Sequence, residues 1–196
     1  MMEYLVCRME RPDWDAIPAA LMRHTGWLPL CPVSAWAQAC HDGTRLYLRL
    51  QAEERAIRAT LKGPLDPVCQ DSCLEFFFAP LAEDERYFNF EWNPLGTLYL
   101  GFGIGREIRV RQIVQDRELF RPRPFFTEGG WGIEFSIPET FFQIYMPTFR
   151  LSGRSHGNFY KCADQSEIPH YLAWSVPTCG TPDFHRREDF GTMLFT

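Results

Sequence analysis

Two neighbouring stretches of the chain alternate large apolar side chains with other residues. The apolar positions are Leu74, Phe76 and Phe78 in residues 70–78, and Phe88, Phe90 and Trp92 in residues 87–93. A period of two is typical of strands with one buried face. The other positions are Cys73, Glu75 and Phe77, then Tyr87, Asn89, Glu91 and Asn93. That mixed face suits a polyhydroxylated ligand, and it equally fits the solvated face of an antiparallel sheet.

The same alternation predicts further strands along the chain. They are expected at residues 3–9, 33–40, 45–51, 106–114, 131–137, 158–164, 170–175 and 190–195. Asp42-Gly43 lies between two of these runs and is a strong hairpin signal, with Leu46, Leu48 and Leu50 on the core side. We expect short helical turns at 12–24 and 139–144, a short helix or loop at 52–61, and a Pro-rich connection at 115–128.

These elements predict the fold class. Eight to ten short strands, regular turn signals and no long helix indicate an all-β fold, an antiparallel β-sandwich with short helical turns. The 196 residues contain no Gly/Ser/Pro-rich linker or sharp change of composition. We therefore expect a single domain over residues 1–196.

Charge and cysteine content exclude several classes of function. A net charge of −5 argues against a nucleic-acid partner, and charged residues interrupt every apolar run before it could cross a membrane. The amino terminus lacks the features of a secretory signal. The seven cysteines form no CxxC pair, so we expect reduced, mostly buried thiols in a cytoplasmic protein. Cys69 and Cys73 are four apart, a spacing for which we favour a structural role over metal binding.

A glycine pattern at Gly101, Gly103 and Gly105 raises the alternative of a nucleotide site. A dinucleotide fingerprint opens a helix, whereas residues 106–114 alternate like a strand. The pattern therefore fails the structural context that phosphate binding requires.

Six segments, in order, resemble the family 9 carbohydrate-binding modules, and particularly the family 9-like domains of bacteria. They are residues 70–77, 88–91, 131–138, 158–164, 172–175 and the tail from Asp183 to Gly191. The resemblance implies an immunoglobulin-like or jelly-roll sandwich that binds a mono- or oligosaccharide without cleaving it and serves carbohydrate catabolism. The resemblance gives no oligomeric state. It implies one cofactor, a structural calcium ion, whose ligands the sequence does not identify.

The resemblance also implies a set of sugar-binding residues. In typical members two tryptophans clamp a terminal sugar ring; one precedes the Gln-Asp-Ser element, where residues 66–69 carry no aromatic residue, and the other corresponds to Phe184. An aromatic ring packs on the apolar side of a pyranose, while carboxylates and amides bind its hydroxyls. The expected carbohydrate site comprises Glu75, Asn89, Glu91, Lys161, Phe184 and His185, with no catalytic residue and no metal ligand.

Three alternatives remain open at this point. A glycosidase could use a carboxylate pair from Glu75, Glu91 and Glu134, although the sequence shows no cleft. His170 and His185 could form a metal site with Asp164, Asp183 and Glu188, although the ligands are far apart in sequence. A haem-binding sandwich would use Met or His axial ligands, which the composition permits without suggesting it.

Overall fold

The fold is a β-sandwich in which the hydrogen-bonded path turns from one layer into the other. The computed structural model describes residues 2–116 and 118–196. Within them lie thirteen strands: β1 Glu3–Arg8, β2 Ala20–His24, β3 Ser34–His41, β4 Arg45–Glu53, β5 Cys73–Ala79, β6 Tyr87–Trp92, β7 Leu98–Ile104, β8 Ile108–Gln112, β9 Arg123–Phe126, β10 Gly130–Pro138, β11 Gly153–Cys162, β12 Tyr171–Ala173 and β13 Gly191–Phe195. The helical elements are α1 Glu139–Tyr145, η1 Val68–Gln70 and η2 Arg187–Asp189.

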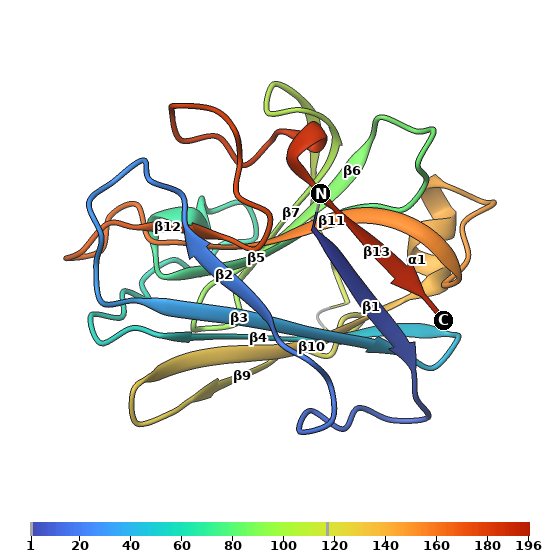
Figure 1. Cartoon of the computed structure of the whole chain (residues 1–196), viewed down its shortest axis with the longest axis horizontal. Coiled ribbons are helices and arrows are strands. Elements are labelled where there is room, and N and C mark those ends of the chain that lie inside the picture. The colour runs from blue at the N-terminus through green and yellow to red at the C-terminus, as the bar shows by residue number, and fades with distance from the viewer. Residues whose placement is uncertain (1, 117) are drawn as a thin grey trace.

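The two layers are joined at one side (Figure 1). The strand order is β8-β7-β6-β5-β11-β12-β2-β3-β4-β10-β9, and β2 pairs with β12 of the upper layer and β3 of the lower layer. Neighbours along this path are antiparallel. Strand β1 is the exception, because it pairs in parallel with both β13 and β3. The prediction of an all-β antiparallel sandwich is confirmed, with more strands than the eight to ten expected.

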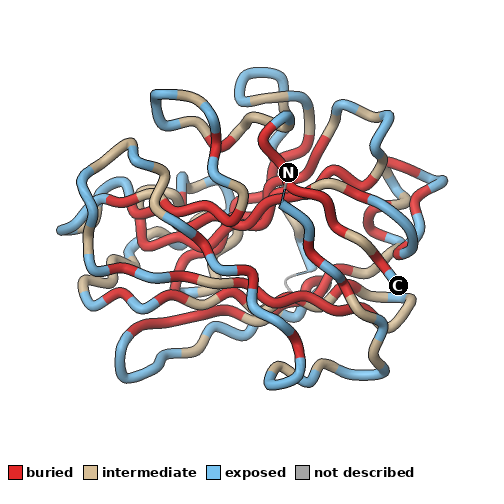
Figure 2. The backbone as a smooth tube through the Cα atoms, viewed as in Figure 1, coloured by how far each residue is buried: buried red, intermediate tan, exposed pale blue. Residues whose placement is uncertain are grey.

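The hydrophobic core lies between the layers (Figure 2). All six alternating apolar residues of β5 and β6 belong to it, from Leu74 to Trp92. Phe76 stacks on the rings of Phe78, Phe90 and Phe159 at centroid distances of 5.4, 6.3 and 5.3 Å. From the lower layer, Leu46, Leu48 and Leu50 of β4 are fully buried, as predicted.

The predicted hairpin joins β3 to β4. Gly43 adopts φ +92°, a conformation that side-chain-bearing residues rarely adopt, and Asp42 Oδ1 accepts hydrogen bonds from the backbone N–H groups of Thr44 and Arg45. The same carboxyl accepts a bond from the Tyr47 hydroxyl at 2.7 Å. Partial burial is the largest single influence and raises the pKa of Asp42, but these hydrogen bonds together outweigh it and lower the pKa to about 2.

Two sequence predictions of secondary structure were wrong. Residues 12–24 were expected to form a helical turn, but they end in β2, where Ala20 and Met22 are buried and Leu21 is exposed. Residues 115–128 were expected to be a connection, but they contain β9, which pairs with β10. Both strands are short, five residues in β2 and four in β9, so local alternation is too brief to reveal them.

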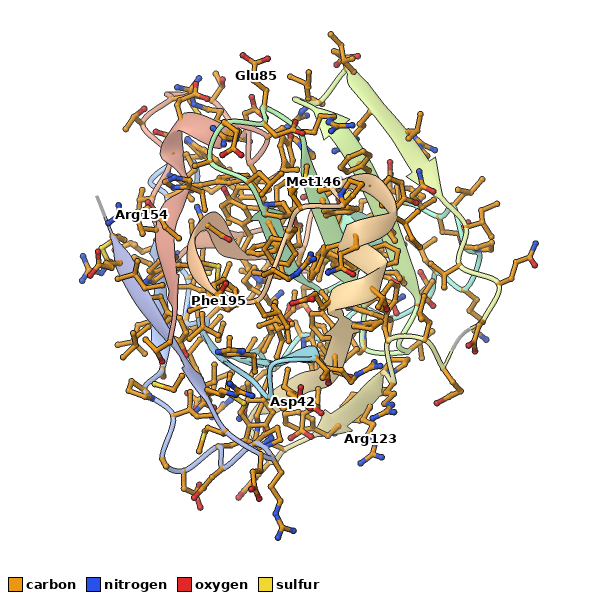
Figure 3. The ribbon with its side chains drawn as sticks, turned by 90° about the vertical axis from the view of Figure 1, so that its right-hand side faces the viewer. Asp42, Glu85, Arg123, Met146, Arg154 and Phe195 are labelled. Atoms are coloured by element: carbon orange, nitrogen blue, oxygen red, sulfur yellow. The ribbon has the colours of Figure 1, made fainter. Side chains whose placement is uncertain are left out.

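Helix α1 connects β10 of the lower layer to the upper layer across one end of the sandwich (Figure 3). Its buried Phe141 and Phe142 pack against Phe88, with centroids 5.5 and 5.4 Å away. No helix in the described part of the chain is long and apolar enough to span a membrane.

Candidate functional site

The mixed face of β5 and β6 is covered by chain, and is not the solvated surface that the sequence allowed. Strand register places four of its side chains in one row across the upper layer: Tyr160, Glu75, Glu91 and Tyr99. All four are at most 5% exposed. The loop before β13 lies above this face at the top of Figure 1, beside the turn between β7 and β8.

A pocket of about 210 Å³ opens between these loops and the row. Its floor includes Glu75, Glu91 and Cys162, and its walls come from residues near 27, 67–69, 99–111, 164–171 and 182–185. Pockets for drug-sized ligands hold roughly 300–1,000 Å³, so this one suits a ligand about the size of a single sugar ring.

Glu75 and Glu91 are directly opposite each other on adjacent strands, only 2% and 5% exposed. Glu75 Oε1 accepts a hydrogen bond from the Cys162 thiol at 2.9 Å, and Glu91 Oε1 accepts one from Asn89 Nδ2 at 2.7 Å. Both carboxyls line the pocket. Burial raises the pKa of both carboxyls, and for Glu75 the neighbouring Glu91 raises it further. The pair therefore offers buried oxygens to a ligand with hydroxyl donors.

Asn89 lies behind the pocket and is not part of its lining. It is fully buried, and its amide holds Glu91 while its Oδ1 has no partner within the described chain. Gly101 on the next strand leaves room for it, because a Cβ there would overlap Asn89 Oδ1. The structure thus gives Asn89, expected at the sugar, a position from which it orients Glu91.

An aromatic wall stands on one side of the pocket. Phe184 is stacked on Tyr160 with centroids 4.0 Å apart and is only 8% exposed. Trp27 packs on Phe184 at 5.5 Å and on Tyr171 at 5.7 Å, and its Nε1 donates to the Cys179 carbonyl oxygen at 2.8 Å. Trp27 and Tyr171 are half-buried, so they offer more free ring surface than Phe184.

Trp27 and Tyr171 were missed by the sequence reasoning. The aromatic residue absent from residues 66–69 is supplied by Trp27, which lies in a loop after β2. A tryptophan outside any predicted strand could have indicated a binding residue, but the sequence around Trp27 does not indicate which strands its side chain packs over.

The opposite wall is basic and comes from the β7–β8 hairpin. Arg106, Arg109 and Arg111 line it, together with His185 from the last loop. Arg109 Nη1 lies 2.9 Å from His185 Nδ1, and the Tyr87 hydroxyl is 2.8 Å from the same nitrogen. Burial, and then the two arginines Arg109 and Arg106, lower the pKa of His185 to about 2, so its ring is neutral. The structure therefore places His185 at the pocket, but its Nδ1 already contacts Arg109 and Tyr87.

The prediction for Lys161 needs correction. In β11 it pairs with Leu74, not with Glu75, so its side chain is on the core side of the sheet. There its Nζ lies 3.0 Å from Glu54 Oε2, and both side chains are almost fully buried, at 0% and 2% exposure. The physical reason is the strand period of two, since a shift of one residue moves a side chain to the other face.

The fold divides the residues of the metal alternative. Asp164, Asp183 and His185 line the pocket. His170 instead lies beside Glu54 with a 3.6 Å contact, and Glu188 is paired with Arg186 at 2.8 Å. The closest group of ligand-type atoms in the described chain is Cys73, Glu75 and Cys162, within 4.8 Å of one another. Two thiols and one carboxyl suit zinc better than calcium, which takes six to eight oxygens. Calcium therefore does not fit this group, and its place stays an open prediction.

The carboxylate set suggested for a glycosidase is also divided. Glu75 and Glu91 face each other, but Glu134 is on β10 in the other layer, 3.7 Å from Arg49. A larger groove of about 440 Å³ lies at Trp92, Leu95 and Phe120, yet its lining includes no buried charged side chain. The pocket at Glu75 and Glu91 is taken as the candidate site because it brings four of the predicted residues together, namely Glu75, Glu91, Phe184 and His185.

Comparisons with solved structures show what the chain is similar to. A protein from Bacteroides uniformis ATCC 8492, described provisionally as carbohydrate-binding, matches with a TM-score of 0.84, 25% identity and coverage of 99% of both chains. Two structures of a family 9 carbohydrate-binding module from Caldicellulosiruptor kristjanssonii match at 10% identity. The one bound to cellotriose has a TM-score of 0.67 and coverage of 98% of this chain and 93% of that chain; the one bound to glucose has a TM-score of 0.63 and coverage of 100% and 96%.

The last two structures show the fold alone. A comparison with curated proteins gives no match. The family model described as carbohydrate-binding family 9 matches residues 13–195, which is nearly the whole chain. The chain belongs to carbohydrate-binding family 9.

Proposed function

We propose that this protein binds carbohydrate, without cleaving it, in the pocket above Glu75 and Glu91. The observation that carries the proposal is the juxtaposition, in one pocket, of a half-buried aromatic wall, Trp27 and Tyr171, with the two buried carboxyls of Glu75 and Glu91. A pyranose presents an apolar C–H face and equatorial hydroxyls, and these two surfaces complement it. Membership of a carbohydrate-binding family supports the same function.

The roles of individual residues follow from their positions. Trp27 would stack on the ring, and Phe184 would hold Trp27 in place from below through its stack on Tyr160. Glu75 and Glu91 would accept hydrogen bonds from hydroxyls, and Asn89 would orient Glu91. Lys161 has no part in this site because it is on the other face of the sheet.

A relative's ligands give the first compounds to test. The Caldicellulosiruptor module is seen with glucose and with cellotriose. The small pocket volume favours recognition of one sugar ring, so a monosaccharide and the end of an oligosaccharide should bind comparably.

The test is a thermal-shift and calorimetric screen against mono- and oligosaccharides. A ligand present at 100 times its Kd stabilises the fold by about 2.7 kcal/mol, which raises the Tm by roughly 5–11 °C for a chain of this size. Trp27→Ala and Glu75→Gln should abolish the rise. Trp14→Ala is the matched control, since Trp14 is a half-buried tryptophan outside the pocket. Absence of any sugar-dependent rise in the wild type, or its retention in Trp27→Ala, would refute the proposal.

We propose further that this protein is bacterial and acts in the cytoplasm, in carbohydrate catabolism. Seven cysteines that form no disulfide within the described chain support a reducing compartment. Fractionation of cells producing a tagged chain tests the location, and recovery outside the cytoplasm would contradict it.

A further inference from the structure

Three arginines gather at one wall of the pocket, and their pairing is incomplete. Arg106 is the exception, because it forms an ion pair with Asp183 at 3.2 Å and contacts the Pro182 carbonyl oxygen at 3.3 Å. Arg109 contacts only the His185 ring and Tyr99. Arg111 has a single contact, its guanidinium lying 5.3 Å from the Tyr99 ring centroid. Within the described chain, neither Arg109 nor Arg111 has a carboxylate within ion-pair distance.

The sheet geometry holds these two guanidinium groups in place. Arg109 and Arg111 are two positions apart on β8, so both side chains project from the same face. Their cross-strand partners on β7 are Gly103 and Gly101, which have no side chains to block the path. Both guanidinium groups therefore fold inward over Tyr99, whose ring is 4% exposed, toward the row that contains Glu91. Cation–π contact orients them without neutralising their charge.

Arg109 offsets part of the rise that burial causes in the pKa of Glu91, but a neutral sugar would leave Arg111 without an anionic partner. Hydroxyl recognition is already provided by the carboxyls and the aromatic wall on the other side of the pocket. Arginine presents a planar fork of donors that matches carboxylate and phosphate in a bidentate geometry. The neighbouring His185 is neutral and accepts from Arg109, so it does not supply the missing anion.

From this geometry we infer that the ligand is an acidic sugar, a uronic acid or a sugar phosphate, whose ring stacks on Trp27 and whose anionic group binds Arg109 and Arg111. The inference rests on the proposed function, and it assigns the substrate class within that function. Glu75 and Glu91 accept the ring hydroxyls, while the anion lies at the β8 side of the pocket. The carboxyls and the arginines therefore bind opposite ends of one small molecule.

Isothermal titration of matched sugars tests this inference. Glucose is compared with glucuronic acid and with glucose 6-phosphate, and galactose with galacturonic acid, at low and at high ionic strength. We expect an acidic sugar to bind at least about tenfold more tightly than its neutral counterpart, because charge-assisted hydrogen bonds are roughly twice as strong as neutral ones. High salt should reduce that preference. Whether the uronic acid or the phosphate binds better identifies the source of the anion.

Two variants make the test specific. Arg111→Gln should reduce the preference for the acidic sugar over its neutral counterpart by about tenfold and leave the fold intact, since Arg111 is exposed and contacts only the Tyr99 ring among the described residues. Arg123→Gln is the control. Arg123 is an exposed arginine on β9 in the lower layer, labelled in Figure 3, and should leave both affinities unchanged.

The outcomes separate the inference from the proposed function. Equal binding of neutral and acidic sugars, or an acidic preference that survives Arg111→Gln, overturns the inference and leaves carbohydrate binding in place. Inorganic phosphate that binds as tightly as glucose 6-phosphate also overturns it, because the arginines would then recognise a free anion. No binding of any sugar refutes both.

Discussion

Replacing Lys161 with Met separates a structural role from a sugar-binding one. The Lys161 ammonium donates to Glu54 at 3.0 Å and to the Cys162 carbonyl oxygen at 2.8 Å. Glu54 also accepts hydrogen bonds from Ser72 Oγ at 2.8 Å and Trp131 Nε1 at 3.0 Å. Methionine keeps the apolar stem of Lys161 but removes the charge, so that the Glu54 carboxylate stays buried with two neutral donors.

Breaking a buried ion pair by removing one partner costs about 3–5 kcal/mol, because the remaining charge has lost its counter-ion. Surface ion pairs contribute less than about 1 kcal/mol. The larger cost applies here because the side chains of Lys161 and Glu54 are almost fully buried. For a chain of this size, the same cost lowers the Tm by roughly 6–20 °C. The double variant with Glu54→Gln removes the unpaired charge and should recover much of the loss.

Urea unfolding, followed by tryptophan fluorescence, measures the free energies of the wild type, both single variants and the double variant. Sugar affinity is measured at a temperature where all four are folded. The reasoning is refuted if Lys161→Met costs less than about 1 kcal/mol, as a solvated pair would. It is equally refuted if the stable double variant loses sugar binding, since Lys161 would then act at the pocket.

Three more outcomes are expected. Burial raises the pKa of Glu75, so its contribution to stability is fully present below the ordinary pKa of about 4.3 and is lost as the pH rises through the raised value; Glu75→Gln should therefore flatten the fall in unfolding free energy, measured in urea from about pH 4 to pH 8. Gly101→Ala should displace Asn89 from Glu91 and weaken sugar binding in calorimetry about tenfold, whereas Gly180→Ala, with open space at its Cβ, should not. Phe76→Ala should cost about 3–5 kcal/mol in urea unfolding because it empties a fully buried stack; a cost below about 1 kcal/mol would contradict the packing described.

The sandwich was predictable because several of its strands carry their own signal. In β5 and β6 the alternation of Phe76 and Phe90 with polar residues defines both the strands and the face that enters the core. The hairpin at Asp42-Gly43 is equally local. Strands β2 and β9 were missed because they have only five and four residues, too few to show a clear alternation, and Pro124 stands within β9.

The pocket was predictable only where strand register sufficed. Glu75 and Glu91 were expected together and lie directly opposite each other. A further strand, β11, enters the same sheet from seventy residues later, and an error of one position there exchanged the core-facing Lys161 for the pocket-facing Tyr160. Along a strand the sequence specifies which residues share a face, but only the pairing between strands specifies which face it is.

The loop residues show a different limit. Trp27, Phe184 and Arg109 come from three segments far apart in sequence that the fold brings to one pocket. Trp27 packs on Phe184 there, and no local sequence pattern indicates that contact. Arg109 and Arg111 alternate on β8 with apolar residues that are themselves exposed, so their pattern resembled an ordinary edge strand. Opposite them on β7 are Gly103 and Gly101, which carry no side chain, and both guanidinium groups lie over the Tyr99 ring. The glycine spacing that first suggested a nucleotide loop thus has a structural explanation in the sheet: Gly101 leaves room for Asn89 behind Glu91, and Gly103 lets the backbone of β8 approach closely at Arg109.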